Sequence, residues 1–130
     1  MRKSISLMLA AVLVAAVPAA GAEKLAPEAQ LSRAVEGRVA GAAVDCINLR
    51  PMNSTQIIRD SAIIYDAGST LYVNRPRSGA QSLDSWNTLF TRSHGSQLCR
   101  GDVVEVVDPT TGTTRGLVFL GEFVPYKRAR

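Results

Sequence analysis

Short apolar runs alternate with turn-forming residues from about residue 45 onward. Runs of this length between Gly, Pro, Asn and Asp are typical of β-strands in antiparallel sheets. The pattern predicts two hairpins with shorter strands before them, and Gly121–Tyr126 closes the domain. The predicted strand segments are Asp45–Ile47, Gln56–Arg59, Ala62–Tyr65, Thr70–Asn74, Asp102–Val107 and Thr114–Leu120.

The first hairpin turns at residues 66–69, where Gly68 favours a tight turn. We expect Tyr65 to face Thr70 across the turn. The alternation then places one apolar set on each face: Ala62, Ile64, Leu71 and Val73 on the first, and Ile63, Tyr65 and Tyr72 on the second. Because both faces are apolar, neither is expected to be fully solvated.

The second hairpin turns at residues 108–112, where Asp-Pro begins the turn and Gly112 can adopt a positive φ. Its first strand is almost continuously apolar, with valine at 103, 104, 106 and 107. Such a run is typical of a strand that is buried on both faces.

Apolar residues recur at the spacing of a helix in two segments. Glu28–Glu36 predicts a short helix, with Pro27 near its first turn, Gly37 as its stop and an apolar face of Leu31, Ala34 and Val35. Leu83–Phe90 also has helical spacing but is short. The sequence therefore predicts a mainly β fold, a small antiparallel sandwich or partly open barrel with a short N-terminal helix. The alternative is α+β, with Leu83–Phe90 as a helix on the sheet.

The first 22 residues have the pattern of a secretory signal peptide. Arg2 and Lys3 precede an apolar run, and the small residues Ala20 and Ala22 precede a cleavage site before Glu23. The run is shorter than the roughly 20 residues that span a membrane. We therefore expect an exported protein, periplasmic or secreted, with no transmembrane span after cleavage. The expected organisation is signal peptide 1–22, an N-terminal segment with the helix 23–44, a β-domain 45–126 and a basic tail 127–130.

Cleavage would also change the charge. The whole chain has a formal charge of +4, and removal of Arg2 and Lys3 lowers it to +2. The tail, with Lys127, Arg128 and Arg130, accounts for the remaining excess. The body is close to neutral, so its charge does not favour a nucleic-acid partner.

Cys46 and Cys99 are the only cysteines. In an oxidising compartment they predict one disulfide, which would stabilise the fold by up to about 4 kcal/mol. The alternative is a cysteine nucleophile with His94 as its base, which needs a free thiolate. A zinc site is not expected, because two Cys and one His fall short of four ligands.

Five strings stand in order along the chain and resemble a family of small exported proteobacterial proteins with a domain of unknown function. They are Cys46–Arg50, Ile57–Asp60, Thr70–Asn74, Leu98–Asp102 and Gly121–Tyr126. Members of that family often carry two further cysteines, near Ala80 and near Gly116, and both are absent here. The resemblance implies that those two were partners and that Cys46 and Cys99 form the retained bridge. It implies no catalytic residues.

Few residues indicate catalysis. There is no P-loop, GxGxxG, HExxH or calcium loop, so no cofactor or metal is expected. Ser93, His94 and Asp102 could form a triad on paper, but the Gly-x-Ser-x-Gly elbow is missing. Asp60, Asp66, Asp102 and Asp108 lie beside turns, where Asp commonly bonds its own backbone.

The densest basic set outside the tail is Arg75, Arg77, Arg92 and Arg100. If their loops converge, they form a patch for an anion or polysaccharide, with Arg75, Arg77, Arg92 and His94 as the candidate binding residues; otherwise they are solvated loop charges. We therefore expect a non-catalytic binding or structural module of the periplasm or cell envelope, whose partner is an envelope component or another periplasmic protein. The alternatives are an envelope-directed hydrolase that uses His94, and an inhibitor of a periplasmic enzyme.

Overall fold

The computed structural model describes residues 10–14, 25–92 and 95–129. Residues 10–14 are exposed and belong to no helix or strand. Most of the predicted signal peptide lies outside the described residues, so it stays a prediction. In the part that the structure describes, no helix is long and apolar enough to cross a membrane.

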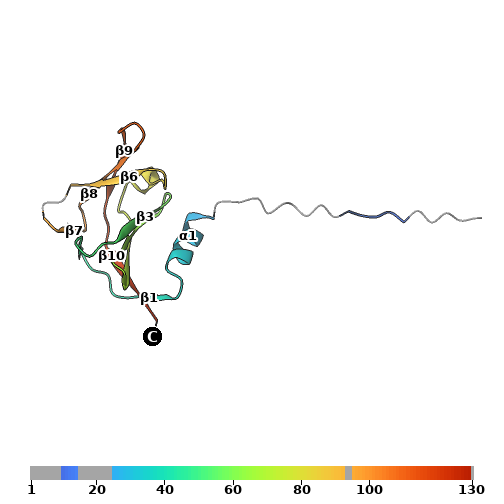
Figure 1. Ribbon diagram of the computed structural model, residues 1–130, viewed down its shortest axis with the longest axis horizontal. Helices are drawn as coiled ribbons and strands as arrows, with labels where there is room; N and C mark the ends of the chain where they lie inside the picture. Colours follow the sequence, from blue (N-terminus) through green and yellow to red (C-terminus); the bar gives the residue numbers. More distant parts are fainter. Residues whose placement is uncertain (1–9, 15–24, 93–94, 130) are drawn as a thin grey trace, which may run out of the picture.

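The described chain is mainly β-strand, with one short α-helix and one 3-10 turn (Figure 1). The helix is α1 (Pro27–Ala34) and the 3-10 turn is η1 (Ala80–Ser82). The strands are β1 (Arg38–Ala40), β2 (Cys46–Asn48), β3 (Ser54–Ile58), β4 (Ala62–Asp66), β5 (Thr70–Asn74), β6 (Thr88–Thr91), β7 (Gln97–Cys99), β8 (Val103–Val107), β9 (Thr114–Phe119) and β10 (Phe123–Arg128). The mainly β prediction is confirmed.

The strands form three antiparallel sheets. The largest has the order β1-β10-β5-β4-β3, the second has the order β6-β8-β9, and β2 pairs with β7. The sheets pack over a shared interior as a small sandwich and do not close into a barrel. The α+β alternative is wrong, because Leu83–Phe90 contains a buried residue at Leu83, a short turn and strand β6 instead of a helix.

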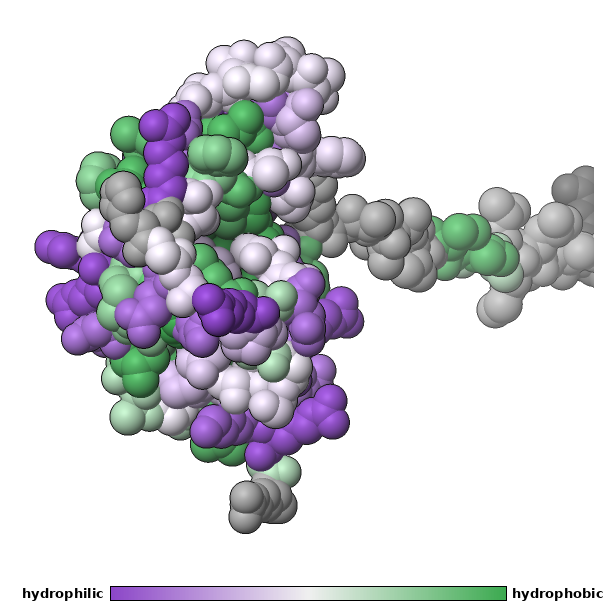
Figure 2. Space-filling model, turned by 60° about the vertical axis from the view of Figure 1, so that its left-hand side comes forward, coloured by the Kyte–Doolittle hydropathy of each residue, from purple (hydrophilic) through white to green (hydrophobic). Residues whose placement is uncertain are grey.

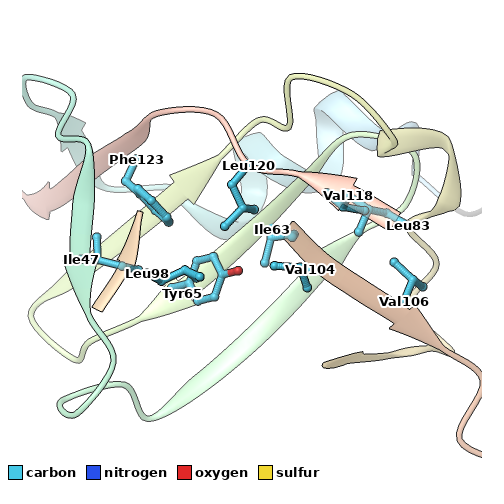
Figure 3. Packing of buried hydrophobic residues seen from close by; sticks show 10 residues of the cluster. All are labelled: Ile47, Ile63, Tyr65, Leu83, Leu98, Val104, Val106, Val118, Leu120 and Phe123. Carbon is cyan, nitrogen blue, oxygen red and sulfur yellow. The ribbon is translucent and has the colours of Figure 1, made fainter. Parts of the chain in front are cut away.

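All three sheets contribute to the main core (Figure 3). Phe123 and Tyr65 meet edge to face there, with ring centres 5.9 Å apart. The buried members are Ile47, Ile63, Tyr65, Leu83, Leu98, Val104, Val106, Val118, Leu120 and Phe123. Because these residues come from every sheet, one apolar interior holds the layers together.

A second core lies on the other face of the large sheet, beneath α1. Leu31 of the helix is buried there, and Ala34 and Val35 pack against the same cluster. The sheet contributes Ile58, Ala62, Ile64, Leu71 and Val73. The β4–β5 hairpin is thus buried on both faces, as its pattern predicted, and Gly37 follows the helix with φ of 76°.

The predicted register of this hairpin is wrong by two positions, since Tyr65 faces Tyr72 and not Thr70. The Asp66 carboxylate accepts a hydrogen bond from Gly68 N–H at 2.7 Å, and Ala67 N–H donates to Thr70 O at 2.9 Å. The turn therefore begins one residue later than expected. An even shift leaves every side chain on its predicted face.

Strand β8 differs from its prediction, because only one of its faces is buried. Val104 and Val106 are fully buried, whereas Val103 is 38% exposed. The sheet β6-β8-β9 has the main core on one side and solvent on the other. We call the solvent side the outer face; its exposed apolar residues are Phe90, Val103, Leu117 and Phe119.

Cys46 and Cys99 lie opposite each other on β2 and β7 and form the predicted disulfide. Neither is a free thiol in this structure. The alternative of a cysteine nucleophile is therefore wrong, since the bridge leaves no thiolate.

Candidate functional site

The structure brings together only part of the predicted basic patch. Arg75 and Arg77 follow β5 and line one hollow together with Arg100, which follows β7. Arg92 lines a different hollow, over the outer face. His94 lies outside the described residues, so its place in the patch, and the hydrolase alternative that uses it, stay predictions.

We call the first of these the basic hollow. It has a volume of about 310 Å³ and combines three guanidinium groups with one carboxylate, one phenol and two valines. Its lining residues are Val73, Arg75, Arg77, Arg100, Gly121, Glu122, Val124 and Tyr126. Hydrophilic and hydrophobic residues are intermixed on the face drawn in Figure 2.

One buried side chain joins the two segments that form this hollow. Asn74, at the end of β5, is fully buried. Its Nδ2 donates to Gly121 O at 2.8 Å, and Gly121 N–H donates to its Oδ1 at 3.0 Å. Asn74 thus fastens the chain before Arg75 to the chain before Glu122.

Gly121 lets these two segments approach closely. A Cβ at this position would collide with the backbone carbonyl oxygen of Arg75. Glycine is therefore required by the close contact between the segments. The contact places Arg75 and Arg77 beside Glu122, although the two segments lie far apart in the sequence.

Arg75 is already engaged. Its guanidinium binds both carboxylate oxygens of Glu28, with distances of 2.8 Å and 3.0 Å. The hydrogen bond and charge of Arg75 lower the pKa of Glu28, and the hydrogen bond that Arg75 donates to Glu28 raises the pKa of Arg75. Since Glu28 belongs to α1, this exposed pair ties the helix to the rim of the basic hollow.

The other two arginines differ in their surroundings. Arg100 lies 3.0 Å from Glu122 and 4.0 Å from Asp45. Arg77 is exposed, and its backbone N–H donates to Phe119 O at 2.8 Å. Within the described ranges, no carboxylate lies within 4.0 Å of the Arg77 guanidinium. Arg77 therefore presents its donors to solvent and to any ligand in the hollow.

This arrangement suits an anion. A guanidinium donates several hydrogen bonds in one plane, which matches the oxygens of a carboxylate or a phosphate. Arg75 and Arg100 are paired with carboxylates, so Arg77 supplies the positive charge that is open to a ligand. The Tyr126 ring and the valines add an apolar wall.

Arg92 lies over the outer face instead. Its guanidinium lies 3.7 Å from Glu105 and 5.9 Å from the centre of the Phe90 ring. This geometry is consistent with a weak surface ion pair and a cation–π contact. Arg92 thus lies apart from Arg75 and Arg77, so the loops of the basic set converge only in part.

The turn aspartates behave as predicted in three of four cases. Asp66, Asp102 and Asp108 each accept a hydrogen bond from a nearby backbone N–H. Asp60 instead takes a left-handed conformation, with φ of 57°, and pairs with Arg59 at 3.7 Å. The Asp102 carboxylate accepts the Cys99 N–H at 2.7 Å. The other two members of the triad considered from the sequence, Ser93 and His94, lie outside the described residues.

Sequence reasoning missed Glu28, Glu122 and Tyr126 at this site. Nothing local marks them, because each becomes part of the site only through the packing of α1 and β10 beside β5. No family model matches the chain, and no curated protein or solved structure matches it.

Proposed function

We propose that this chain is an exported, non-catalytic binding module whose basic hollow captures an anionic group of the cell envelope. The observation that carries the proposal is the convergence of Arg75, Arg77 and Arg100 on one hollow, with Arg77 free of any described carboxylate. The ligand group would be a carboxylate or a phosphate, the oxygen acids that a guanidinium binds best.

The location in this proposal is supported by two features. The disulfide between Cys46 and Cys99 fits an oxidising compartment, where such bridges persist. The first 22 residues have the order of charged, apolar and small residues that directs export. A periplasmic or secreted module would meet envelope polymers that carry carboxylates and phosphates.

The experiment is co-sedimentation of the purified protein with a washed envelope fraction. The test variant is Arg77→Ala with Arg100→Ala, because Arg75→Ala would also break the ion pair that ties Glu28 of α1 to the hollow. Loss of two charge-assisted contacts should weaken retention at least roughly tenfold. High salt should weaken retention of the wild type in the same way, because it screens exposed charges.

The matched control is Arg50→Ala, which removes an exposed arginine outside the basic hollow. It should retain the wild-type affinity, and circular dichroism should show that all variants are folded. Unchanged retention of the double variant, or equal loss in Arg50→Ala, would count against the basic hollow as the binding site.

A further inference from the structure

The chain has one tryptophan, and its side chain faces solvent. Trp86 is 76% exposed. It stands on a tight turn in which the Asp84 carboxylate accepts Trp86 N–H at 3.2 Å and Asp84 O accepts Asn87 N–H at 3.0 Å. The turn fixes the backbone beneath an indole that contributes little to the core.

Trp86 lines the rim of an open hollow of about 750 Å³, larger than the basic hollow and separate from it. We call it the Trp86 hollow. The turn between β3 and β4, the segment from η1 to Asn87 and the turn between β8 and β9 form its walls. Its polar lining includes Arg59, Asp60, Gln81, Asn87, Asp108 and Arg115.

Four of the five charged groups of this lining form two pairs, and the fifth, Asp84, accepts the Trp86 N–H. Arg115 lies 3.1 Å from Asp108, and Arg59 lies 3.7 Å from Asp60. Hydrogen-bond donors and acceptors therefore stand side by side, and the amides of Gln81 and Asn87 offer both kinds. The exposed indole of Trp86 therefore stands among both donors and acceptors.

We propose that the Trp86 hollow is a second binding site, which takes a neutral sugar unit of a polysaccharide. A sugar ring has hydroxyl groups that both donate and accept hydrogen bonds, and it has apolar C–H faces. The paired charges and amides suit the hydroxyl groups, and the indole offers an apolar surface to a C–H face. The proposal uses none of the residues of the basic hollow.

Other ligand classes fit the lining less well. An anion would meet the carboxylates of Asp60, Asp84 and Asp108, and a cationic peptide would meet the guanidiniums of Arg59 and Arg115. A purely apolar ligand would remove these charged groups from water without compensation, which is costly.

The sole tryptophan makes the site directly observable. Tryptophan emission of the purified full chain comes only from Trp86, so its titration with maltotetraose, cellotetraose or chitotetraose reports on this hollow. We expect a saturable change with at least one of them. Calorimetry with that sugar should show a roughly 30-fold loss of affinity for Trp86→Ala, the loss typical of a tryptophan hot spot.

Two control variants keep the result specific. Phe90→Ala removes an exposed aromatic ring from the outer face, and Arg77→Ala disturbs the basic hollow; both should bind the sugar as the wild type does. The proposal is overturned if none of the three sugars gives a saturable change, or if binding survives Trp86→Ala. It is also overturned if tetralysine binds through Trp86 and the sugars do not, since the partner would then be a cationic peptide.

Discussion

Asn74 and Tyr65 are both buried, but they differ in whether their polar atoms form hydrogen bonds. Asn74 places both ends of its amide against the backbone of Gly121, so its polar atoms are satisfied. The Tyr65 hydroxyl is buried and has no hydrogen-bond partner among the described residues. A buried polar group that forms hydrogen bonds stabilises the contact it makes. A buried polar group without a hydrogen-bond partner lowers the stability of the fold.

Asn74→Ala should destabilise the fold by about 2–4 kcal/mol, because it leaves the N–H and C=O of Gly121 buried without partners. Urea unfolding measures this change. Asn53→Ala, at an exposed asparagine, is the control and should stay within about 0.5 kcal/mol of the wild type. An equal loss of stability in both variants would show that the hydrogen bonds between Asn74 and Gly121 do not stabilise the fold.

Tyr65 should make stability depend on alkaline pH. Burial raises the pKa of Tyr65 above its usual value of about 10. Above pH 10 the unfolded chain releases this proton and the folded chain keeps it, so the free energy of unfolding falls as pH rises. Tyr65→Phe should lose less stability between about pH 9 and pH 11.

At pH 7 the same variant should change the free energy of unfolding by less than about 1 kcal/mol, because no hydrogen bond is lost. A larger loss at pH 7, or an unchanged pH profile, would mean that the hydroxyl has a partner in solution.

Among the elements, β4 and β8 look alike in sequence but differ in the structure. Both have apolar residues at successive positions, and for both the pattern predicts burial on two faces. Helix α1 covers the second face of β4, whereas no described element covers the outer face of β8. The apolar pattern identifies each strand. Whether the second face of the strand is covered depends on where a distant helix packs, and the sequence pattern does not predict that position.

Neighbouring valines on β8 test this difference. Val104→Thr should cost about 1–3 kcal/mol, because it buries a hydroxyl in the main core without altering the shape of the side chain. Val103→Thr should stay within about 0.5 kcal/mol of the wild type, since Val103 is on the outer face. Thermal and urea unfolding of the two variants measure the contrast, and equal losses would indicate that the outer face is covered in solution.

The placement of η1 against β9 supports one proposal made from the family resemblance. The Ser82 side chain occupies the space that a Cβ on Gly116 would take. Cysteines near Ala80 and near Gly116 would therefore lie close together. Two cysteines at these places could therefore be partners, as the resemblance implies.

At the scale of the whole molecule, local patterns predicted the helix, the two hairpins and the disulfide. They did not predict the basic hollow or the Trp86 hollow. The basic hollow depends on the contact between Asn74 and Gly121, and the Trp86 hollow depends on three turns that meet only in the folded chain. Charge density in the sequence found Arg75, Arg77 and Arg100, whereas Arg92 of the same set lines a different hollow.

The disulfide should account for a large part of the stability. Replacing Cys46 and Cys99 by Ser should lower the free energy of unfolding by up to about 4 kcal/mol, since the bridge joins residues 53 positions apart. Urea unfolding with and without a reductant measures this loss. Mass spectrometry of the protein from an exporting host should show a bridged chain that begins at Glu23; free thiols or an uncleaved chain would contradict the proposed export.

Strand order in the large sheet has a consequence for synthesis. The final strand, β10, lies between β1 and β5 and pairs with both. A chain that emerges from a channel with its N-terminus first cannot complete this sheet until residues 123–128 have emerged. Cys46 and Cys99 emerge earlier, so the bridge can form while the sheet is still open. Under the export proposed above, this topology would keep the large sheet open until residues 123–128 have crossed the membrane.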